Sequence, residues 1–361
     1  MEYIPLVIVV ILISLDKYSY KKILVLFIIV CLFILSMLIS QYRILIEYLI
    51  FIVGAKNVSL HRITKVYLLT GCVLLIITII SAKMGIIENL IYIRNGKRRE
   101  AFGVGYPTDF AAHIFYLIGA YLYLRGKNTN IFEYIVLVLI TMIIYRLCDT
   151  RLDCICMIIA IIFSCLYKRN KIKFNKRIVK NFLIMSCVIL SSISIYTSIN
   201  YKANNKIYIK VNEIISNRLY IGKMMYDEYG VTIFGQKIDD HGFGGSEVFK
   251  YDKYNFIDCS YMRILLKYGI IAFIIVIFFS TLLLYKFYKN HDYLLVLLFV
   301  CVIINSVIAQ HFIDFSYNYI ILFYMAKLNN DNRNIIKDNT KKIELENYNI
   351  YRKGGSYYDT I

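Results

Sequence analysis

Segment 94–107 combines a cluster of basic side chains with three glycines and lies between two long apolar stretches. Its cations are Arg94, Lys97, Arg98 and Arg99. Guanidinium groups form paired hydrogen bonds to phosphate or carboxylate, and Gly103 and Gly105 allow backbone N–H groups to approach a ligand closely. We therefore predict an anion site in this segment. The alternative is a cluster that only lies beside lipid phosphates.

A second group of charged side chains, at 146–153, separates two further apolar stretches. Its members are Arg146, Asp149, Arg151 and Asp153. Ionisable groups next to apolar spans are usually paired with one another and are often functional. Two interpretations are therefore open: the arginines bind an anion, or they pair with the aspartates and cap the ends of two helices.

The longest polar connection, 200–258, begins with apolar residues that recur at helical spacing from Val211 to Leu219. We expect a helix on the membrane surface, with Asn217 and Arg218 beside its apolar face. The glycine-rich run 242–245 follows and is typical of a flexible loop. The length of this connection and its glycines suggest a gate for substrate access.

Metal and cofactor chemistry are not predicted. Asp239, Asp240 and His241 are suitable ligand types, but adjacent residues in a loop rarely converge on one ion. The nine cysteines lie mostly within apolar stretches, where they pack as small hydrophobic residues. Their number and spacing indicate neither a disulfide framework nor a zinc site.

The composition is that of a polytopic membrane protein: 59% of the 361 residues are hydrophobic, 18% are charged, and the mean hydropathy is +0.60. We predict an all-α fold with one membrane domain, 1–326, which includes the extracytoplasmic loop 200–258, and a mobile cytoplasmic tail, 327–361. Eleven transmembrane helices are expected at 3–15, 23–39, 44–54, 66–82, 106–124, 131–147, 154–167, 181–199, 261–285, 293–309 and 312–326. Spans 3–15, 44–54 and 154–167 are short enough to be tilted or re-entrant.

The net charge of +18 falls mostly in short connections between apolar stretches, as orientation signals do, and it does not indicate nucleic acid. Neighbouring basic clusters are separated by two spans each, so all of them can be cytoplasmic. We therefore predict a multi-pass protein of the cell membrane with its N-terminus outside and its C-terminus in the cytoplasm. The outer connections are then 88–105, 146–153, 200–258 and 310–314.

Several short motifs occur in order along the chain: Arg99-Glu100-Ala101-Phe102-Gly103 with Tyr106-Pro107-Thr108, then Asp149-Thr150-Arg151, Asn217-Arg218 with Tyr229-Gly230 and Phe234-Gly235, and Asp258-Cys259-Ser260-Tyr261 with Tyr268-Gly269. Their order resembles that in the Wzy-type, O-antigen polymerase-like enzymes of bacterial capsule and exopolysaccharide assembly, over most of the chain. The chain departs from the family's His-Pro-Asn pattern at Tyr106 and Thr108, so no role of that histidine transfers to this segment.

The resemblance implies a glycosyltransferase that joins undecaprenyl-diphosphate-linked oligosaccharide repeat units on the outer face of the membrane. The catalytic candidates are Arg99, Arg151, Arg218, Asp258 and His311. Arginines would stabilise the diphosphate leaving group, and the base for the acceptor hydroxyl is one of Asp258, His311, His241 and Asp149. The substrate-binding candidates are Arg94, Arg98, Gly103, Asp149, Asn217 and Tyr261.

The expected partners are the lipid-linked oligosaccharide and membrane lipids, with a flippase and chain-length regulators as candidate protein partners. The alternatives are a flippase or other transporter, which would carry ionisable residues at mid-depth and show internal repeats, or a polysaccharide ligase of related fold. Neither mid-depth charges nor internal repeats are evident, because the unusual polar residues gather in the outer connections.

Overall fold

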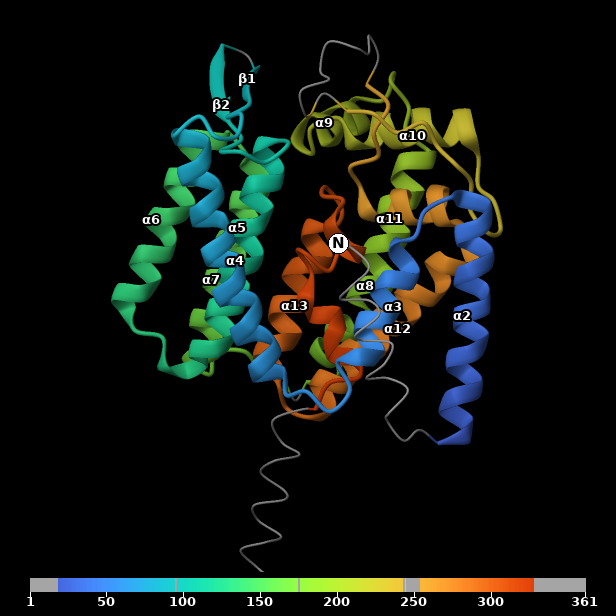
Figure 1. Cartoon of the computed structure of the whole chain (residues 1–361), viewed down its shortest axis with the longest axis horizontal. Helices are drawn as coiled ribbons and strands as arrows, with labels where there is room; N and C mark the ends of the chain where they lie inside the picture. Colours follow the sequence, from blue (N-terminus) through green and yellow to red (C-terminus); the bar gives the residue numbers. More distant parts are fainter. Residues whose placement is uncertain (1–18, 95, 175, 243, 245–253, 328–361) are drawn as a thin grey trace, which may run out of the picture.

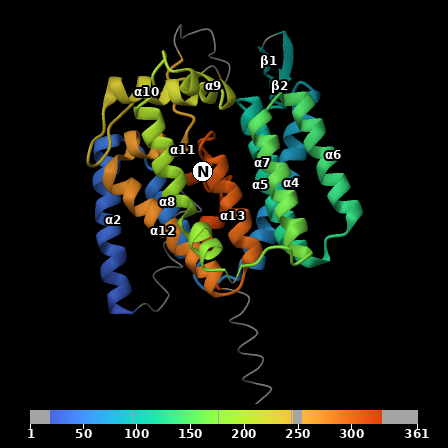
Figure 2. The same ribbon diagram turned by 180° about the vertical axis from the view of Figure 1, so that it is seen from behind.

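The computed structural model describes residues 19–94, 96–174, 176–242, 244 and 254–327. The predicted span 3–15 and the tail beyond residue 327 lie outside this part of the chain. The described chain is a bundle of helices with a small hairpin and two short helices at one end (Figures 1 and 2). We call the end that carries the hairpin, β1 and β2, and the short helices α9 and α10 the cap end.

The bundle helices follow the predicted apolar stretches closely. They are α2 (Tyr20–Ser40), α3 (Ile44–Gly54), α4 (Leu60–Lys83), α5 (Pro107–Arg125), α6 (Ile131–Cys148), α7 (Arg151–Lys168), α8 (Arg177–Ile199), α11 (Ser260–Arg263), α12 (Gly269–Lys289) and α13 (Tyr293–Asn305). A π-helical turn, η2 (Ile264–Tyr268), joins α11 to α12. The helical backbone is interrupted at Gly269, whose φ is 88° and ψ is 172°, and the N–H groups of Ile270 and Ile271 donate to the carbonyls of Thr232 and Ile233.

Five helical segments of the described chain are long and apolar enough to cross a membrane: α2, α4, α6, α8 and Ser260–Lys289, which comprises α11, η2 and α12. Helices α3 and α13 are apolar but shorter. The prediction of a mainly helical chain with membrane-crossing helices is thus confirmed. The number eleven is not, since length and composition identify only these five in the described chain.

Helix α13 is the centre of the bundle. Residues Leu294–Ile303 of α13 are buried on every side, as expected for a helix that is apolar all round. Helices α4, α5, α6 and α7 lie on one side of it, and α2, α3, α8 and α12 lie on the other (Figures 1 and 2). The charged ends of the helices are therefore brought together at the two ends of the bundle.

The prediction of a transmembrane helix at 312–326 is wrong. This stretch forms two short 3-10 helices, η3 (His311–Ile313) and η4 (Tyr319–Tyr324). Its backbone groups bond to side chains of other elements: the Tyr48 hydroxyl donates to the Asn318 carbonyl at 3.0 Å, and Lys286 Nζ donates to the carbonyls of Phe323, Tyr324 and Ala326. Non-helical backbone at membrane depth is stable only where protein surrounds it, and most of η4 is buried.

The polar connections at the cap end are more ordered than the sequence predicted. Segment 94–107 begins with an antiparallel hairpin of β1 (Ile91–Arg94) and β2 (Lys97–Glu100), in which Tyr92 pairs with Arg99. The single surface helix expected in 200–258 is two helices, α9 (Lys206–Ile214) and α10 (Arg218–Tyr229). The break falls at Ser216 and Asn217, which both have positive φ.

Candidate functional site

A small cleft of about 50 Å³ lies at the cap end of the bundle. Six separate parts of the chain line it: the hairpin, the start of α5, the turn between α6 and α7, the start of α10, Asp258 just before α11, and the turn after α13. Its polar lining is Arg94, Arg99, Thr108, Asp109, Asp149, Thr150, Arg151, Asp153, Ser216, Arg218, Asp258, Gln310 and His311. Most of the predicted catalytic residues are therefore neighbours in space.

Arg99 is the most deeply buried arginine of the cleft, with 1% of its surface exposed. Side chains alternate across a strand, so Arg99 points into the protein while its neighbour Arg98 faces outward. Its Nε donates to the Cys148 carbonyl at 2.7 Å, and its guanidinium lies 5.3 Å from the centre of the Tyr106 ring. Its Nη2 is buried and has no hydrogen-bond partner among the described residues.

An unpartnered guanidinium nitrogen in a buried position is costly, because the group has lost water without gaining an acceptor. Native proteins retain such groups mainly where a ligand or a solvent molecule completes the bonding. The Nη2 of Arg99 therefore identifies the place in the cleft where an additional acceptor, such as a phosphate oxygen, is needed.

Arg94 reaches the cleft from β1 and binds the turn between α6 and α7. Its Nη2 donates to the Asp149 carboxylate at 2.7 Å and to the Asp149 carbonyl at 3.0 Å. Asp149 ends α6 in the left-handed region, at φ 48°. The mutual pairing considered for the 146–153 group is therefore not found in the described chain, because Asp149 pairs with Arg94 of the hairpin and not with Arg146 or Arg151.

Arg151 is the first residue of α7 and lines the cleft with an exposed side chain. It makes no ion pair or hydrogen bond within the described chain. Two residues further along α7, the buried Asp153 accepts a hydrogen bond from Asn305 Nδ2 at 3.0 Å. Because a helix N-terminus favours negative charge, an anion between Arg151 and Arg99 would also face the start of α7.

Arg218 and Asp258 form an ion pair across the other side of the cleft, with Nη2 and Oδ1 separated by 3.3 Å. Two backbone carbonyls fix the arginine: those of Ser216, at 2.7 Å from Nη1, and Ile308, at 3.3 Å from Nε. Burial raises the pKa of Asp258, while the Arg218 charge and the Tyr254 hydroxyl, which donates to Asp258 at 2.7 Å, act in the opposite direction.

His311 lies against the aromatic ring of Tyr317, with ring centres 3.8 Å apart, and is 5% exposed. Its Nε2 is 3.4 Å from Oδ1 of Asp109, in the first turn of α5. A carboxylate beside one imidazole nitrogen fixes the ring's orientation. This pair is the best-oriented proton acceptor in the cleft.

The cleft is balanced in charge, since four arginines and four aspartates line it. Two of the arginines, Arg94 and Arg218, are paired with aspartates, whereas Arg99 and Arg151 have no carboxylate partner within the described chain. An incoming polyanion would bind the two unpaired guanidinium groups directly. It would then compete with Asp149 and Asp258 for Arg94 and Arg218. This competition would draw the bound anion toward the centre of the cleft.

Four predicted substrate-binding residues do not line the cleft. Arg98 is 64% exposed and pairs with Glu100, and Tyr261 is fully buried with its hydroxyl bonded to the Ile303 carbonyl. Asn217 accepts a hydrogen bond from Asn212 in the break between α9 and α10. Gly103 has φ 88° and packs against α4, where an added Cβ would lie 2.6 Å from Ile87 Cδ1. These residues shape the walls and do not contact the space.

The candidate base His241 also lies away from the cleft, in a bridge with Asn255. Its neighbour Asp240 pairs with Arg263 at 2.9 Å and with Lys267. Within the described residues no group of three or more His, Cys, Asp or Glu side chains has metal-binding geometry. Of the three adjacent residues 239–241, Asp239 and His241 lie close together, with Oδ1 and Nδ1 separated by 3.9 Å, whereas Asp240 pairs with other elements.

Sequence reasoning missed Asp109, Tyr106 as the ring beneath Arg99, and Asn305. A signal for Asp109 was present, since Asp109 and His113 are one turn apart near the start of an otherwise apolar helix. Nothing in the sequence places Asn305 next to Asp153, because 152 positions separate them.

Comparison with family models, with curated proteins and with solved structures gave no match. What the chain offers is the cleft itself, which gathers guanidinium, carboxyl and imidazole groups at one end of an apolar helical bundle. Such a set can bind a multiply charged anion and accept a proton beside it.

Proposed function

We propose that this chain is a membrane glycosyltransferase that joins polyprenyl-diphosphate-linked oligosaccharide units, with the cap-end cleft as its active site. The observation that carries the proposal is the buried Arg99, whose Nη2 lacks an acceptor among the described residues, in a cleft with three further arginines. The motif order of Wzy-type polymerases and the membrane-crossing helices agree with it.

The arginines bind the diphosphate of the donor. As the acceptor hydroxyl attacks the anomeric carbon, the bond from that carbon to the diphosphate oxygen breaks and charge accumulates on the leaving group. Arg99 and Arg151 stabilise this charge directly, and Arg94 and Arg218 add to it from fixed positions. Preorganised donors at a developing charge are usually the largest contribution to catalysis.

The His311–Asp109 pair takes the proton of the acceptor hydroxyl. Of the four candidate bases, Asp149 and Asp258 are each held by an arginine, and His241 lies outside the cleft. His311 lines the cleft and is positioned by both Tyr317 and Asp109. The polyprenyl diphosphate then leaves as the anion, and the glycan is longer by one unit.

A cleft of about 50 Å³ is much smaller than the roughly 300–1,000 Å³ of typical ligand sites. The lining elements must therefore part when substrates bind. Connection 200–258 supplies Ser216, Arg218 and Asp258 to the lining, so its movement would open the cleft. Active-site closure of this kind excludes water, which protects a donor that would otherwise be hydrolysed.

The cap end is the outer face in this proposal. The basic residues at the starts of α2, α4 and α8 and at the ends of α5, α7 and α12 lie at the opposite end of the bundle, the end expected to face the cytoplasm. Lys327, whose backbone pairs with Val58 just before α4, lies at that same end. The C-terminus is then cytoplasmic.

The distribution of buried charge favours group transfer over transport. The buried Asp, Glu, Lys, Arg and His side chains of the described chain are Arg99, Asp149, Asp153, Lys267 and His311, and all of them belong to the cap-end half. A transporter would place such groups at mid-depth, where both faces can reach them. A ligase that moves glycan to a different acceptor uses the same chemistry, and the product distinguishes it.

A deletion strain tests the proposal. Loss of a polymerase leaves single repeat units exported and unjoined, whereas loss of a flippase leaves lipid-linked units on the cytoplasmic side. Complementation with the wild-type chain should restore long glycan, and complementation with His311→Gln should not. Units confined to the cytoplasmic side in the deletion strain would contradict the proposed function.

A further inference from the structure

A second and larger space lies at the other end of the bundle. It is a groove of about 360 Å³ between α2, α3, α12 and η4, within the size range of small-molecule sites. Aliphatic and aromatic side chains form nearly all of its wall. The polar groups of two wall residues are bonded within the protein: the Tyr48 hydroxyl donates to the Asn318 carbonyl, and Ser280 Oγ donates to the Val276 carbonyl.

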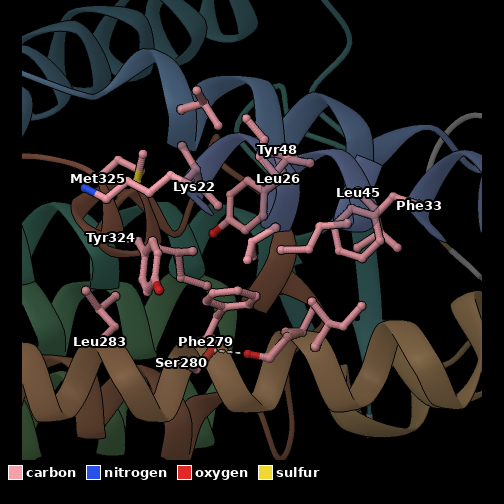
Figure 3. Close-up of a pocket in the computed structure, with 18 of the residues that line it drawn as sticks. Lys22, Leu26, Phe33, Leu45, Tyr48, Phe279, Ser280, Leu283, Tyr324 and Met325 are labelled. Carbon is pink, nitrogen blue, oxygen red and sulfur yellow. Dashed lines mark hydrogen bonds between the residues drawn. The ribbon is translucent and has the colours of Figure 1, made fainter. Parts of the chain in front are cut away.

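The groove has a basic end and an apolar end. Figure 3 shows Lys22 and Met325 at one end and Phe33 and Leu45 at the other, with Phe279 between them. Lys21 and Lys22 lie in the first turn of α2, at the end of the bundle away from the cap (Figure 1), and both side chains are exposed.

The length of the groove matches one leaflet of a bilayer. Lys22 and Phe33 are eleven residues apart on α2, which corresponds to about 16 Å along a helix. Half of a bilayer's hydrocarbon core is about 15 Å thick. A hydrocarbon chain that enters beside the lysines and ends near Phe33 would thus lie wholly within one leaflet.

We propose that this groove binds an anionic glycerophospholipid of the leaflet on the Lys21 and Lys22 side, with one acyl chain in the groove and the phosphate beside the two lysines. Charge complementarity selects this occupant. The competing occupant within the chain is the apolar stretch 3–15, which precedes α2 in the sequence. It contains no acidic residue itself but is flanked by Glu2 and Asp16, and the quenching experiment below distinguishes it from a lipid. The inference requires that the bundle lies in a bilayer, and it does not depend on the transferase activity.

The chain has no tryptophan, so a single introduced indole reports on the lipid at one position. Phe279→Trp places it in the groove, where the native ring is 4.9 Å from that of Tyr324. Phe278→Trp is the matched control, because the next residue of α12 is 56% exposed and does not line the groove. Each full-length variant is reconstituted in phosphatidylcholine containing brominated phosphatidylglycerol or, separately, brominated phosphatidylcholine.

We expect brominated phosphatidylglycerol to quench Phe279→Trp more strongly than its share of the bilayer predicts, with an enrichment of roughly fivefold for each lysine. Phe278→Trp should follow the bulk lipid composition. Adding Lys21→Gln and Lys22→Gln should remove the preference at position 279, whereas Lys65→Gln, which changes an exposed lysine of α4, should not. Native mass spectrometry of the wild-type chain, with and without the two glutamines, checks the lipid count without any tryptophan.

Three results would overturn the proposal. Equal lipid preference at positions 278 and 279 would mean ordinary boundary lipid. Quenching at 278 with none at 279 from either lipid would mean that the protein itself fills the groove. A preference that persists in the Lys21→Gln, Lys22→Gln variant would mean that these lysines do not bind the phosphate.

Discussion

Replacing Arg99 by lysine keeps one positive charge but removes the planar guanidinium fork. The structure indicates what is lost. The Nε donor to the Cys148 carbonyl, at 2.7 Å, has no equivalent in lysine, and the guanidinium stacked 5.3 Å from the Tyr106 ring is replaced by a smaller, more strongly hydrated ammonium. The unpartnered Nη2 also disappears, and with it the donor that the proposal assigns to the diphosphate.

The magnitudes separate a structural role from a catalytic one. Loss of the hydrogen bond from a charged donor to the Cys148 carbonyl should lower the free energy of unfolding by roughly 1.5–3 kcal/mol. Removal of a donor aimed at the developing charge should lower the joining rate by roughly 100- to 1,000-fold. The second effect exceeds what partial unfolding explains, provided that activity is expressed per folded molecule.

The assay compares Arg99→Lys with Arg98→Lys in the same hairpin. Arg98 is 64% exposed and its side chain pairs with Glu100 at 3.4 Å, so its replacement should change stability by less than about 0.5 kcal/mol and leave joining intact. Glycan length in the complemented deletion strain is measured together with the amount of monodisperse protein. Joining by Arg99→Lys within a few-fold of wild type would refute the role of the fork. Equal loss in both variants would point to a general disturbance of the hairpin, because lysine keeps the positive charge at both positions.

Three further outcomes are expected. Burial raises the pKa of Asp258. The contribution of this group to the free energy of unfolding is therefore greatest below about pH 4, and it is lost as the pH rises through the raised pKa. Asp258→Asn should remove that pH-dependent loss in thermal unfolding measured from about pH 4 to 8. Gly235→Ala should destabilise the chain by about 1–3 kcal/mol, because φ is 91° and an added Cβ would lie 2.3 Å from the Lys267 carbonyl oxygen. Gly105→Ala should not destabilise it, because an added Cβ there meets nothing within 4 Å. Chemical denaturation compares the two variants. In intact cells a membrane-impermeant thiol reagent should label Lys97→Cys and not Lys171→Cys, and the reverse pattern would invert the orientation.

The helices could be predicted because each apolar stretch has to satisfy its backbone internally at membrane depth. Stretch 23–39 lies within α2, and 66–82 lies within α4. The same reasoning failed for 312–326, because hydropathy does not show that Lys286 and Tyr48 bond the carbonyls of this stretch. A segment enclosed by other helices can satisfy its backbone groups with their side chains and does not need α-helical hydrogen bonds of its own.

The cleft could be predicted in part because topology alone brings the outer connections to one end. Arg99, Arg151 and Arg218 were assigned from three separate connections, and all three line the same space. The partners within the cleft were beyond reach, since the pairing of Arg94 with Asp149 depends on the tilt of a hairpin over a turn 55 positions away. The opposite directions of the Arg98 and Arg99 side chains follow from their position in a β-strand. No hairpin was predicted in this glycine-bearing segment, so the sequence did not distinguish the two arginines.

Reconstitution measures the joining reaction most directly. Purified wild-type chain in proteoliposomes is given undecaprenyl-diphosphate-linked repeat units, and both glycan length and free undecaprenyl diphosphate are followed. The proposed function predicts glycans longer than one unit, one undecaprenyl diphosphate released for each bond formed, and little of either with Arg99→Lys or His311→Gln. Units that cross the bilayer but stay single, or glycans that lengthen equally with both variants, would contradict a transferase site in this cleft.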